Sequence, residues 1–398
     1  MAEARSAVAP DKETLSRPLD PVPRVVFLTD IVAPYAVAVL AALAEHVELT
    51  VLFCASTGSR GMPWDLNGAL PFRHRIIGGL TKRRFDQTDV YLSPRVLAAL
   101  RAARPDAVIS SGFSFPTFYA SLYCAARRIP LLIQSDGTSR SEATFTGPRR
   151  AARAYTVRVS AGAVANSMPS ADRFAELGYP SHRIFSAPHS TDVEPFARVA
   201  RQRSYGTSGT LRLLVTGRLI RRKGLDRLLR AFGTAAAARP GVSLDIVGSG
   251  PHEDVLRGLV RDLGIADRVR FRGFMSQEQL PRAYAEADAY AFPTLDDPFG
   301  IVLLEAAVSG LPIIASPRGG ATPDLLDDGV SGLVRDPDDT AAWTQALVAL
   351  ADDPALRERL GRAAHMATIH RTPDAAAAGY ARAVAAVLDG ATAGAHPS

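Results

Sequence analysis

Short apolar runs alternate with longer helical patterns along most of the chain. In the first half such runs cover residues 25–28, 47–53, 107–110 and 131–133, and an Ala- and Leu-rich helical pattern extends to about Glu45. Short apolar runs bounded by turn signals are typical of strands that are covered on both faces, and their alternation with helices indicates βαβ units. The first half therefore predicts a doubly wound α/β domain with a parallel sheet.

The same alternation begins again after a polar stretch at residues 198–209, which we interpret as a linker. Thr372 and Pro373 are a suitable cap and first residue for a last helix that ends near Gly390. The second half thus predicts another Rossmann-like domain. Helical patterns separate its strand-like runs, which lie at residues 211–216, 243–247, 269–271, 289–292 and 313–315.

These patterns give boundaries for each part of the chain. Ligands of doubly wound sheets bind at the carboxyl ends of the strands, so candidate binding residues are expected directly after the strands. The predicted parts are a flexible N-terminal segment (1–22), a first Rossmann-like domain (23–197), a linker (198–209), a second Rossmann-like domain (210–371), a terminal helix (372–390) and a tail (391–398).

Composition narrows the class of protein. With 398 residues, 47% of them hydrophobic, the chain can form two full cores, which excludes a disordered protein. No apolar run approaches the roughly 20 residues of a membrane helix, and no apolar signal region precedes Pro23, so a cytoplasmic protein is expected. Cys54 and Cys124 lie in apolar segments, which favours buried thiols over a disulfide. The arginine- and alanine-rich, lysine-poor composition indicates a GC-rich bacterial source.

The net charge of +6 lies entirely in the first half. Residues 1–200 contain 23 basic and 17 acidic residues, whereas the remainder contains 23 of each. One interpretation of this excess of basic residues is an ordinary solvated surface. The other is a surface that attracts an anionic membrane or a phosphorylated acceptor. Nucleic acid is disfavoured, because no aromatic residues are interleaved with the charges. The basic residues form two clusters, Arg73, Arg75, Lys82, Arg83 and Arg84, and Arg149, Arg150, Arg153 and Arg158.

One segment carries the most specific chemistry. Residues 297–310 read DPFGIVLLEAAVSG, in which seven residues separate Asp297 from Glu305. The apolar run after Gly300 predicts a helix, and a helix that begins there directs unpaired backbone N–H groups at whatever precedes it. The pattern suits a ligand with both phosphate and hydroxyl groups, because N–H groups bind phosphate and carboxylates bind hydroxyls.

A second candidate follows the first strand of the second half. Arg218 and Lys223 lie five residues apart, the first directly after Gly217 and the second directly before Gly224. Two cations suit a diphosphate, and glycine lets the backbone approach it. A solvated turn is the alternative, and it is our interpretation for Arg221 and Arg222. The glycine pair at residues 248–250 lacks the third glycine of a dinucleotide fingerprint, which disfavours nicotinamide chemistry.

Together these segments resemble retaining glycosyltransferases of family 4, which have the GT-B fold. The segment from Asp297 to Glu305 is similar to the E-x7-E signature of that family. The motifs follow one another in family order across about residues 210–335, which is hard to obtain by chance. The other similar segments are residues 217–224 (G-R-L-x-x-x-K-G), 246–251 (a strand ending in G-x-G-P), 271–280 (F-x-G-x-x-x-x-x-x-L) and 318–324 (G-G-x-x-E).

The resemblance implies a role for each matching residue. Arg218 and Lys223 would bind the diphosphate of the donor and stabilise it as the leaving group. Glu305 would bind the ribose hydroxyls, and Asp297 the hydroxyls of the donor sugar. The implied fold is two Rossmann-like domains that face each other across a cleft, without a bound metal. By the same resemblance the N-terminal domain (23–197) would bind the acceptor, the C-terminal domain (210–371) would bind the nucleotide sugar, and the terminal helix (372–390) would cross back to the first domain. The other donor-binding residues that it implies are Gly217, Gly248, Phe274, Met275, Phe299, Gly300 and Ile301.

The chain departs from the family pattern in places. Asp297 and Asp324 stand where the family has Glu. In the first half, the glycine-rich loop expected after the first strand is replaced by residues 30–35 (DIVAPY), and a His that often follows a mid-domain strand is missing. Contacts with the acceptor or the transferred sugar are therefore expected from position alone, at Ala33, Pro34 and Asp136.

The sequence thus predicts a retaining glycosyltransferase that moves a hexosyl unit from a nucleoside-diphosphate sugar, in the first instance a UDP-sugar, to an acceptor. No tightly bound cofactor is expected, since the nucleotide sugar is a co-substrate. Three classes of acceptor stay open: a lipid-linked molecule, a polysaccharide and a natural product. The basic first half favours an anionic or membrane-bound acceptor and peripheral contact with the inner face of the membrane. Two alternatives also stay open: a sugar-nucleotide hydrolase or epimerase on the same fold, and a non-catalytic sugar-nucleotide-binding protein.

Overall fold

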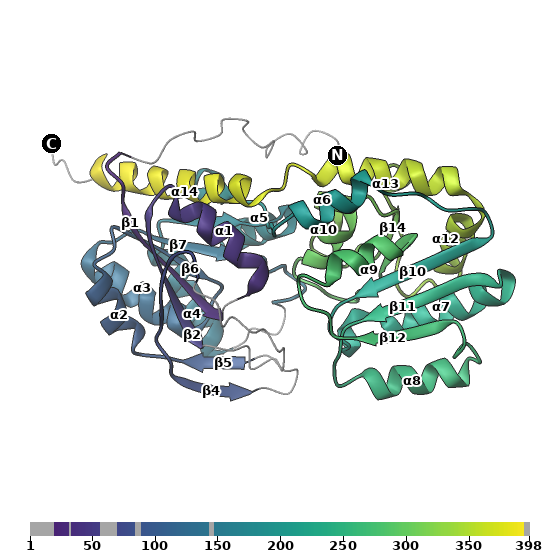
Figure 1. The fold of residues 1–398 in the computed structure, drawn as a ribbon. Helices are drawn as coiled ribbons and strands as arrows, with labels where there is room; N and C mark the ends of the chain where they lie inside the picture. Colours follow the sequence, from purple (N-terminus) through teal and green to yellow (C-terminus); the bar gives the residue numbers. More distant parts are fainter. Residues whose placement is uncertain (1–19, 32, 56–69, 84–88, 143–146, 394–398) are drawn as a thin grey trace. The chain divides into compact units, whose positions relative to one another are not determined.

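The computed structural model describes residues 20–31, 33–55, 70–83, 89–142 and 147–393. The chain forms two compact units. The first unit comprises Met1–Asp192 together with Thr372–Ser398, and the second comprises Val193–Arg371. Each unit contains a parallel sheet with helices on both faces (Figure 1), as expected of doubly wound domains.

The sheet of the first unit has seven parallel strands. Four consecutive residues of β1, 25–28, are buried, because helices cover both faces of the sheet. The winding reverses between β1 and β6, since β2 lies on the other side of β1. In spatial order the strands are β3 (Arg73–Ile76), β2 (Glu48–Ala55), β1 (Arg24–Ile31), β6 (Ala107–Ser111), β7 (Leu131–Ser135), β8 (Gly162–Ala165) and β9 (Ile184–Ser186).

Helices from both ends of the chain cover this sheet. Helices α1 and α14 share one apolar core with it, through residues such as Leu43 and Ala377. Helices α2, α3 and α5 form the core on the other face, with Leu100, Cys124 and Phe174. The remaining elements of the unit are α1 (Pro34–Ala44), the hairpin of β4 (Leu80–Arg83) and β5 (Asp89–Leu92), α2 (Val96–Ala103), α3 (Phe115–Arg127), α4 (Pro148–Val159), α5 (Met168–Glu176), the 3-10 turn η2 (Ser181–Arg183) and α14 (Pro373–Ala393).

The second unit has a sheet of six parallel strands. All five strand-like runs predicted for this half form strands, β10 to β14, and a two-residue strand, β15, completes the sheet. The winding reverses between β10 and β13, because β11 lies on the other side of β10. In spatial order the strands are β12 (Val269–Gly273), β11 (Gly241–Val247), β10 (Thr210–Thr216), β13 (Ala289–Phe292), β14 (Ile313–Ala315) and β15 (Leu333–Val334).

Two helical layers bury this second sheet. Helices α7, α8 and α12 contribute Leu228, Leu256 and Leu347 to the core on one face. Helices α9 and α10 contribute Tyr284 and Leu304 to the core on the other. The helical elements of the unit are α6 (Glu194–Arg201), the 3-10 turn η3 (Arg221–Lys223), α7 (Leu225–Ala238), α8 (Glu253–Asp262), α9 (Leu280–Glu286), α10 (Ile301–Val308), α11 (Thr322–Leu325), α12 (Thr340–Asp352) and α13 (Pro354–Thr368).

The stretch predicted as a linker, residues 198–209, differs from that expectation. It begins inside α6, and Phe196 and Ala197 of this helix are buried in the core of the second unit. The division between the units falls earlier, between Asp192 and Val193. The polar composition of the stretch suggested a solvated linker. Its carbonyl and guanidinium groups are instead hydrogen-bonded within the second unit.

Two buried arginines hold this stretch in place. The guanidinium of Arg357, which is 0% exposed, donates to the carbonyl oxygens of Tyr205 at 2.7 Å and Thr207 at 2.9 Å. Arg203 belongs to the stretch itself and donates to carbonyl oxygens at and just beyond the ends of two helices, where such groups lack helical partners. Its acceptors are Tyr284, Ala287 and Ser309, at 2.7 to 2.8 Å.

The last helix, α14, begins at Pro373 as predicted and continues past Gly390 to Ala393. Alanine on either side of this glycine favours continuation of the helix. Tyr380 of α14 accepts a hydrogen bond from Nδ2 of Asn166 at 3.2 Å, within the first unit. Most of the predicted N-terminal segment and residues 394–398 of the predicted tail lie outside the described residues.

Candidate active site

Three glycines lie where adjacent strands of the second sheet end. Gly217 follows β10, Gly248 follows β11, and Gly273 is the last residue of β12. The N–H of Gly217 donates to the carbonyl of Val247 at 3.0 Å, and the N–H of Gly248 donates to the carbonyl of Gly273 at 2.7 Å. A Cβ on Gly248 would lie 1.9 Å from the carbonyl oxygen of Gly217, so no larger residue fits.

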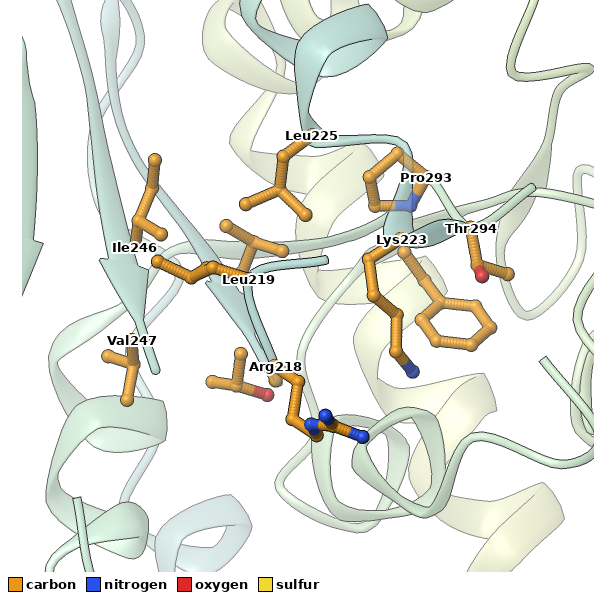
Figure 2. Close-up of a pocket in the computed structure, with 12 residues that line it drawn as sticks. Arg218, Leu219, Lys223, Leu225, Ile246, Val247, Pro293 and Thr294 are labelled. Atoms are coloured by element: carbon orange, nitrogen blue, oxygen red, sulfur yellow. The ribbon is translucent and has the colours of Figure 1, made fainter. Parts of the chain in front are cut away.

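A hollow that is open to solvent lies between the ends of β10 and β13. Residues 215–219 and 292–294 are among those that line it. This is the point at which the winding of the sheet reverses, where ligands of such sheets bind. Figure 2 shows the side chains of Arg218 and Lys223 extending in the same direction, away from Leu225. The structure therefore brings the two predicted diphosphate-binding cations to one hollow.

Lys223 is paired with Asp297. Its Nζ donates to Oδ2 of Asp297 in a short hydrogen bond, and the two side chains are only 16% and 9% exposed. Arg222 lies 4.0 Å from the same carboxylate and donates to the carbonyl of Asp296 at 3.0 Å. Arg222, expected to be a solvated turn residue, is thus a second cation at Asp297. A phosphate that binds Lys223 would compete with Asp297 for it.

Gly300 is the N-cap of α10, as the sequence predicted. Its φ of 92° lies in the left-handed region, and a Cβ there would lie 2.4 Å from Cζ of Phe292, which lines the hollow. The first backbone N–H groups of the helix, including that of Ile301, have no partner within it and favour an anion. Phe299 as a whole residue is 2% exposed and packs in the core of the unit, so its ring does not line the hollow and a backbone contact with a ligand stays a prediction.

Glu305 lies just over a turn further along α10 and is 2% exposed. The O–H of Tyr284 donates to its Oε2 at 2.8 Å, and Nε2 of Gln277 lies 3.5 Å from its Oε1. Burial raises the pKa of Glu305 to about 7, although both hydrogen bonds act to lower it. In the described part of the chain, Glu305 is not among the residues that line the hollow.

Gln277 brings the segment after β12 to Glu305. Phe274 and Met275, predicted to line the nucleobase, precede Gln277 and are half-buried. Met275 packs against the same core as Ile301. The structure therefore places the predicted nucleobase segment next to α10, on the side of Glu305.

The predicted acceptor residues belong to the first unit. Ala33 is the N-cap of α1 and Pro34 its first residue, after the end of β1. Asp136 follows β7, in a turn where the N–H of Gly137 donates to Oγ of Ser135 at 2.9 Å. Strand β6 separates β1 from β7 in the sheet. A role with the acceptor stays a prediction for all three residues.

Tyr284, which contacts Glu305, and Thr216, which contacts Tyr284, carry no signal in the sequence. Tyr284 lies in the short helix α9, and Thr216 is the last residue of a buried strand. Both look like core residues until the fold brings their hydroxyl groups together. The described ranges contain no group of three or more His, Cys, Asp or Glu that could hold a metal ion. Among the described helices, none has the length and apolar character needed to cross a membrane.

Residues 201–366 match the family model described as glycosyl transferases group 1. The second unit is a group 1 glycosyltransferase domain. The match includes the four residues predicted to be catalytic, Arg218, Lys223, Asp297 and Glu305. The predicted relationship to family 4 glycosyltransferases is thereby confirmed.

Curated relatives come from bacteria. The GDP-mannose-dependent alpha-(1-6)-phosphatidylinositol monomannoside mannosyltransferase of Mycolicibacterium smegmatis is 36% identical over 201 residues, 48% of this chain and 52% of that protein. The D-inositol 3-phosphate glycosyltransferase of Pseudarthrobacter chlorophenolicus is 34% identical over 206 residues, 50% of this chain and 49% of that protein. The chain therefore spans about half the length of the curated relatives it matches.

Solved structures match almost the whole chain. The match to HepE of Anabaena, in complex with UDP and glucose, covers 94% of this chain and 99% of the HepE chain, with a TM-score of 0.69 and 19% identity. Sucrose-phosphate synthase from Thermosynechococcus elongatus covers 89% of this chain and 96% of its own, with a TM-score of 0.67 and 19% identity. At this identity the similarity shows the fold alone, and the predicted GT-B fold is confirmed.

Replacing Asp297 by Asn should tighten the binding of free UDP or GDP, because Lys223 would then meet the phosphates without a competing carboxylate. A charge-assisted hydrogen bond contributes roughly 1.5–3 kcal/mol, so the Kd from calorimetry should fall about tenfold. Asp296→Asn removes the same charge one residue away and should change the Kd less than about twofold, because Asp297 is the carboxylate that accepts from Lys223. Weaker binding in the Asp297 variant would show that this carboxylate positions Lys223 instead of competing for it.

Replacing Glu305 by Gln should remove a pH dependence of stability. The pKa of Glu305 is about 7 in the folded protein and about 4.3 in an unfolded chain. The stability that goes with the protonated carboxyl is therefore fully present below about pH 4.3 and is lost as the pH rises through 7. The variant should gain roughly 2–4 kcal/mol over the wild type between pH 4.5 and 8, measured by denaturant unfolding. A difference that stays constant with pH would contradict this assignment.

Proposed function

We propose that the chain is a retaining glycosyltransferase that moves a hexosyl unit from a nucleoside-diphosphate sugar to a hydroxyl group of an acceptor. The observation that carries this proposal is the hollow where Arg218 and Lys223 meet at the reversal point of the second sheet. Phe292 lines the hollow and touches the N-terminal turn of α10. Two cations next to a helix N-terminus suit a diphosphate better than any other common ligand group.

In the proposed reaction the bond between the anomeric carbon of the sugar and the diphosphate oxygen breaks. The acceptor oxygen forms its bond to that carbon on the same face, and its proton passes to the leaving diphosphate. Arg218 and Lys223 neutralise the charge that develops on the leaving group, where fixed cations lower the barrier most. Asp297 contacts the sugar, and Glu305 contacts the ribose, while Ala33, Pro34 and Asp136 remain candidates for the acceptor side.

The nucleobase of the donor is a separate part of the proposal. The mycobacterial relative is named for GDP-mannose, whereas the HepE structure contains UDP. The similarity to the first is higher in sequence, and the similarity to the second extends over more of the chain. GDP-mannose and UDP-glucose are therefore the first donors to test, and UDP-sugars remain candidates as the family resemblance implied.

Lys223→Ala and Arg218→Ala should each weaken binding of the donor about 10- to 150-fold, since each loses a charge-assisted contact of roughly 1.5–3 kcal/mol. Arg221→Ala is the matched control, because Arg221 is an exposed arginine of the same turn that does not line the hollow. Calorimetry gives the affinities, and mass spectrometry of the products gives the transfer. Wild-type affinity in both variants would contradict the assignment. Free sugar without a glycosylated product would favour the hydrolase, and an unchanged donor would favour a binding protein.

The basic surface of the first unit supports an anionic membrane as the place of the acceptor. Residues 91–160 contain ten basic and three acidic residues, whereas the rest of the chain contains 36 basic and 37 acidic residues. The positive excess therefore lies on α2, α3, α4 and their connections, and these helices pack on the same face of the sheet. The exposed apolar side chains Leu97, Phe115 and Leu122 stand on α2 and α3. Such a mixture of cations and apolar groups suits an anionic lipid surface.

The arginines of the two predicted basic clusters are not equally exposed on the surface proposed for membrane contact. Arg153 is 8% exposed and binds Glu142 at 2.8 Å, so it belongs to the interior of the unit. Arg150 and Arg158 are exposed on α4. Arg84 of the first cluster lies outside the described residues. The exposed arginines of α2, α3 and α4 therefore define the surface that we propose for membrane contact.

Reversing Arg101, Arg127 and Arg150 to Glu should lower binding to phosphatidylglycerol-containing vesicles at least about a hundredfold, since each basic residue near such a surface contributes about 1 kcal/mol. Reversing Arg230, Arg261 and Arg362 of the second unit changes the net charge equally and should leave most of the binding. Vesicle co-sedimentation at low and physiological salt measures both. If the wild type ignores acidic vesicles at low salt, a soluble acceptor becomes the better proposal.

A further inference from the structure

A chain of buried hydroxyl groups joins the end of β10 to Glu305. Oγ1 of Thr216 lies 2.9 Å from the hydroxyl of Tyr290 and 3.0 Å from that of Tyr284. The hydroxyl of Tyr284 lies 2.8 Å from Oε2 of Glu305. Thr216 is 7% exposed, both tyrosines are 0% exposed and Glu305 is 2% exposed. Water therefore has little access to this chain of hydrogen bonds.

The carboxylate at one end sets the direction of these hydrogen bonds. An ionised carboxylate can only accept, so Tyr284 donates its single proton to Glu305. The carbonyl of Val302, at 3.3 Å from the same hydroxyl, is the weaker acceptor. The oxygen of Tyr284 then accepts from Thr216, and Thr216 accepts from Tyr290. Tyr284 and Thr216 thus each donate once and accept once, and Tyr290 donates at the far end, which satisfies a buried charge that would otherwise be costly.

The hydrogen bond from Tyr284 also decides which oxygen of Glu305 a ligand can reach. Oε2 is occupied by Tyr284, whereas Oε1 faces Gln277 at 3.5 Å, the limit of a hydrogen bond. Oε1 thus points toward the segment that carries Phe274 and Met275. A carboxylate held by one oxygen in this way can accept a hydroxyl with the other, without first losing rotational freedom.

We propose that Tyr284 is a positioning residue for donor recognition, which holds Oε2 of Glu305 so that Oε1 meets a ribose hydroxyl of the nucleotide. The inference rests on the proposed function, in which Glu305 binds the ribose. Thr216 donates to the oxygen of Tyr284, and Tyr290 lies beyond Thr216, without a direct hydrogen bond to Glu305 in this chain of hydroxyl groups. Because Thr216 directly precedes Gly217 and Arg218, the same hydrogen bonds join the ribose carboxylate to the loop that binds the phosphates.

Tyr284→Phe removes the hydroxyl and keeps the ring, so the variant tests the hydrogen bond with little change in packing. The readout is the Kd of UDP or GDP, whichever binds the wild type more tightly, compared with the Kd of its 2′-deoxy and 3′-deoxy forms. The wild type should prefer the ribonucleotide to at least one deoxy form by about tenfold, because a hydrogen bond to a charged group is lost in the deoxy form. The variant should bind the ribonucleotide about tenfold more weakly and that deoxy form almost unchanged.

Tyr290→Phe is the matched control. It makes the same chemical change in the same buried chain, two hydrogen bonds further from Glu305, and should keep most of the preference for ribose. Glu305→Gln should lose the preference as Tyr284→Phe does. Equal weakening of the ribonucleotide and the deoxy forms in Tyr284→Phe would indicate a purely structural role and overturn the inference.

The variants distinguish the proposed role of Glu305 from the proposed role of Tyr284. If Glu305→Gln loses the preference for ribose and Tyr284→Phe keeps it, the positioning role is wrong and the donor site stands. If Glu305→Gln itself keeps the preference, the proposed role of Glu305 is wrong and the positioning role falls with it. Thermal unfolding of each variant identifies any loss of fold.

Discussion

The ion pair between Lys223 and Asp297 is the interaction on which the site in the second unit depends. It joins the turn after β10 to the loop before α10, two segments that are 74 residues apart in sequence. Backbone contacts follow the same path, because the N–H of Leu295 donates to the carbonyl of Arg222 at 2.8 Å. The pair keeps a mostly buried carboxylate and a mostly buried ammonium satisfied without a ligand, and a phosphate that binds Lys223 would have to compete with it.

Charge is arranged differently at the two ends of the proposed nucleotide. At the phosphate end, Arg218 and Lys223 stand at an open hollow. At the ribose end, Glu305 is buried and satisfied by hydroxyl groups, and burial raises its pKa. A buried carboxylate is costly for the fold, so its presence inside an apolar helix indicates a function. The second unit thus combines two cations at an open hollow with a buried acid that hydroxyl groups satisfy.

Much of this could be predicted from the sequence. Period and length of the apolar runs predicted the five main strands of the second unit, and the glycine and proline signals predicted the starts of α10 and α14. The predicted cations and acids lie in one unit because their motifs follow strand ends, which share an edge in a parallel sheet. The connection between the units was not predicted correctly, because the buried guanidinium groups of Arg203 and Arg357 make a polar stretch part of a core. Nothing in the sequence distinguished Tyr284 from a core tyrosine, since its hydroxyl meets Glu305 only in the folded unit.

A crystal structure of the protein with UDP or GDP bound tests the central claim most directly. We expect the diphosphate in the hollow between β10 and β13, in contact with Arg218 and with Nζ of Lys223, and near the backbone N–H of Ile301. The distance between Nζ of Lys223 and Asp297 should then be longer than in the free protein. A nucleotide that binds elsewhere in the second unit, with the pair between Lys223 and Asp297 unchanged and the hollow free of phosphate, would contradict the account.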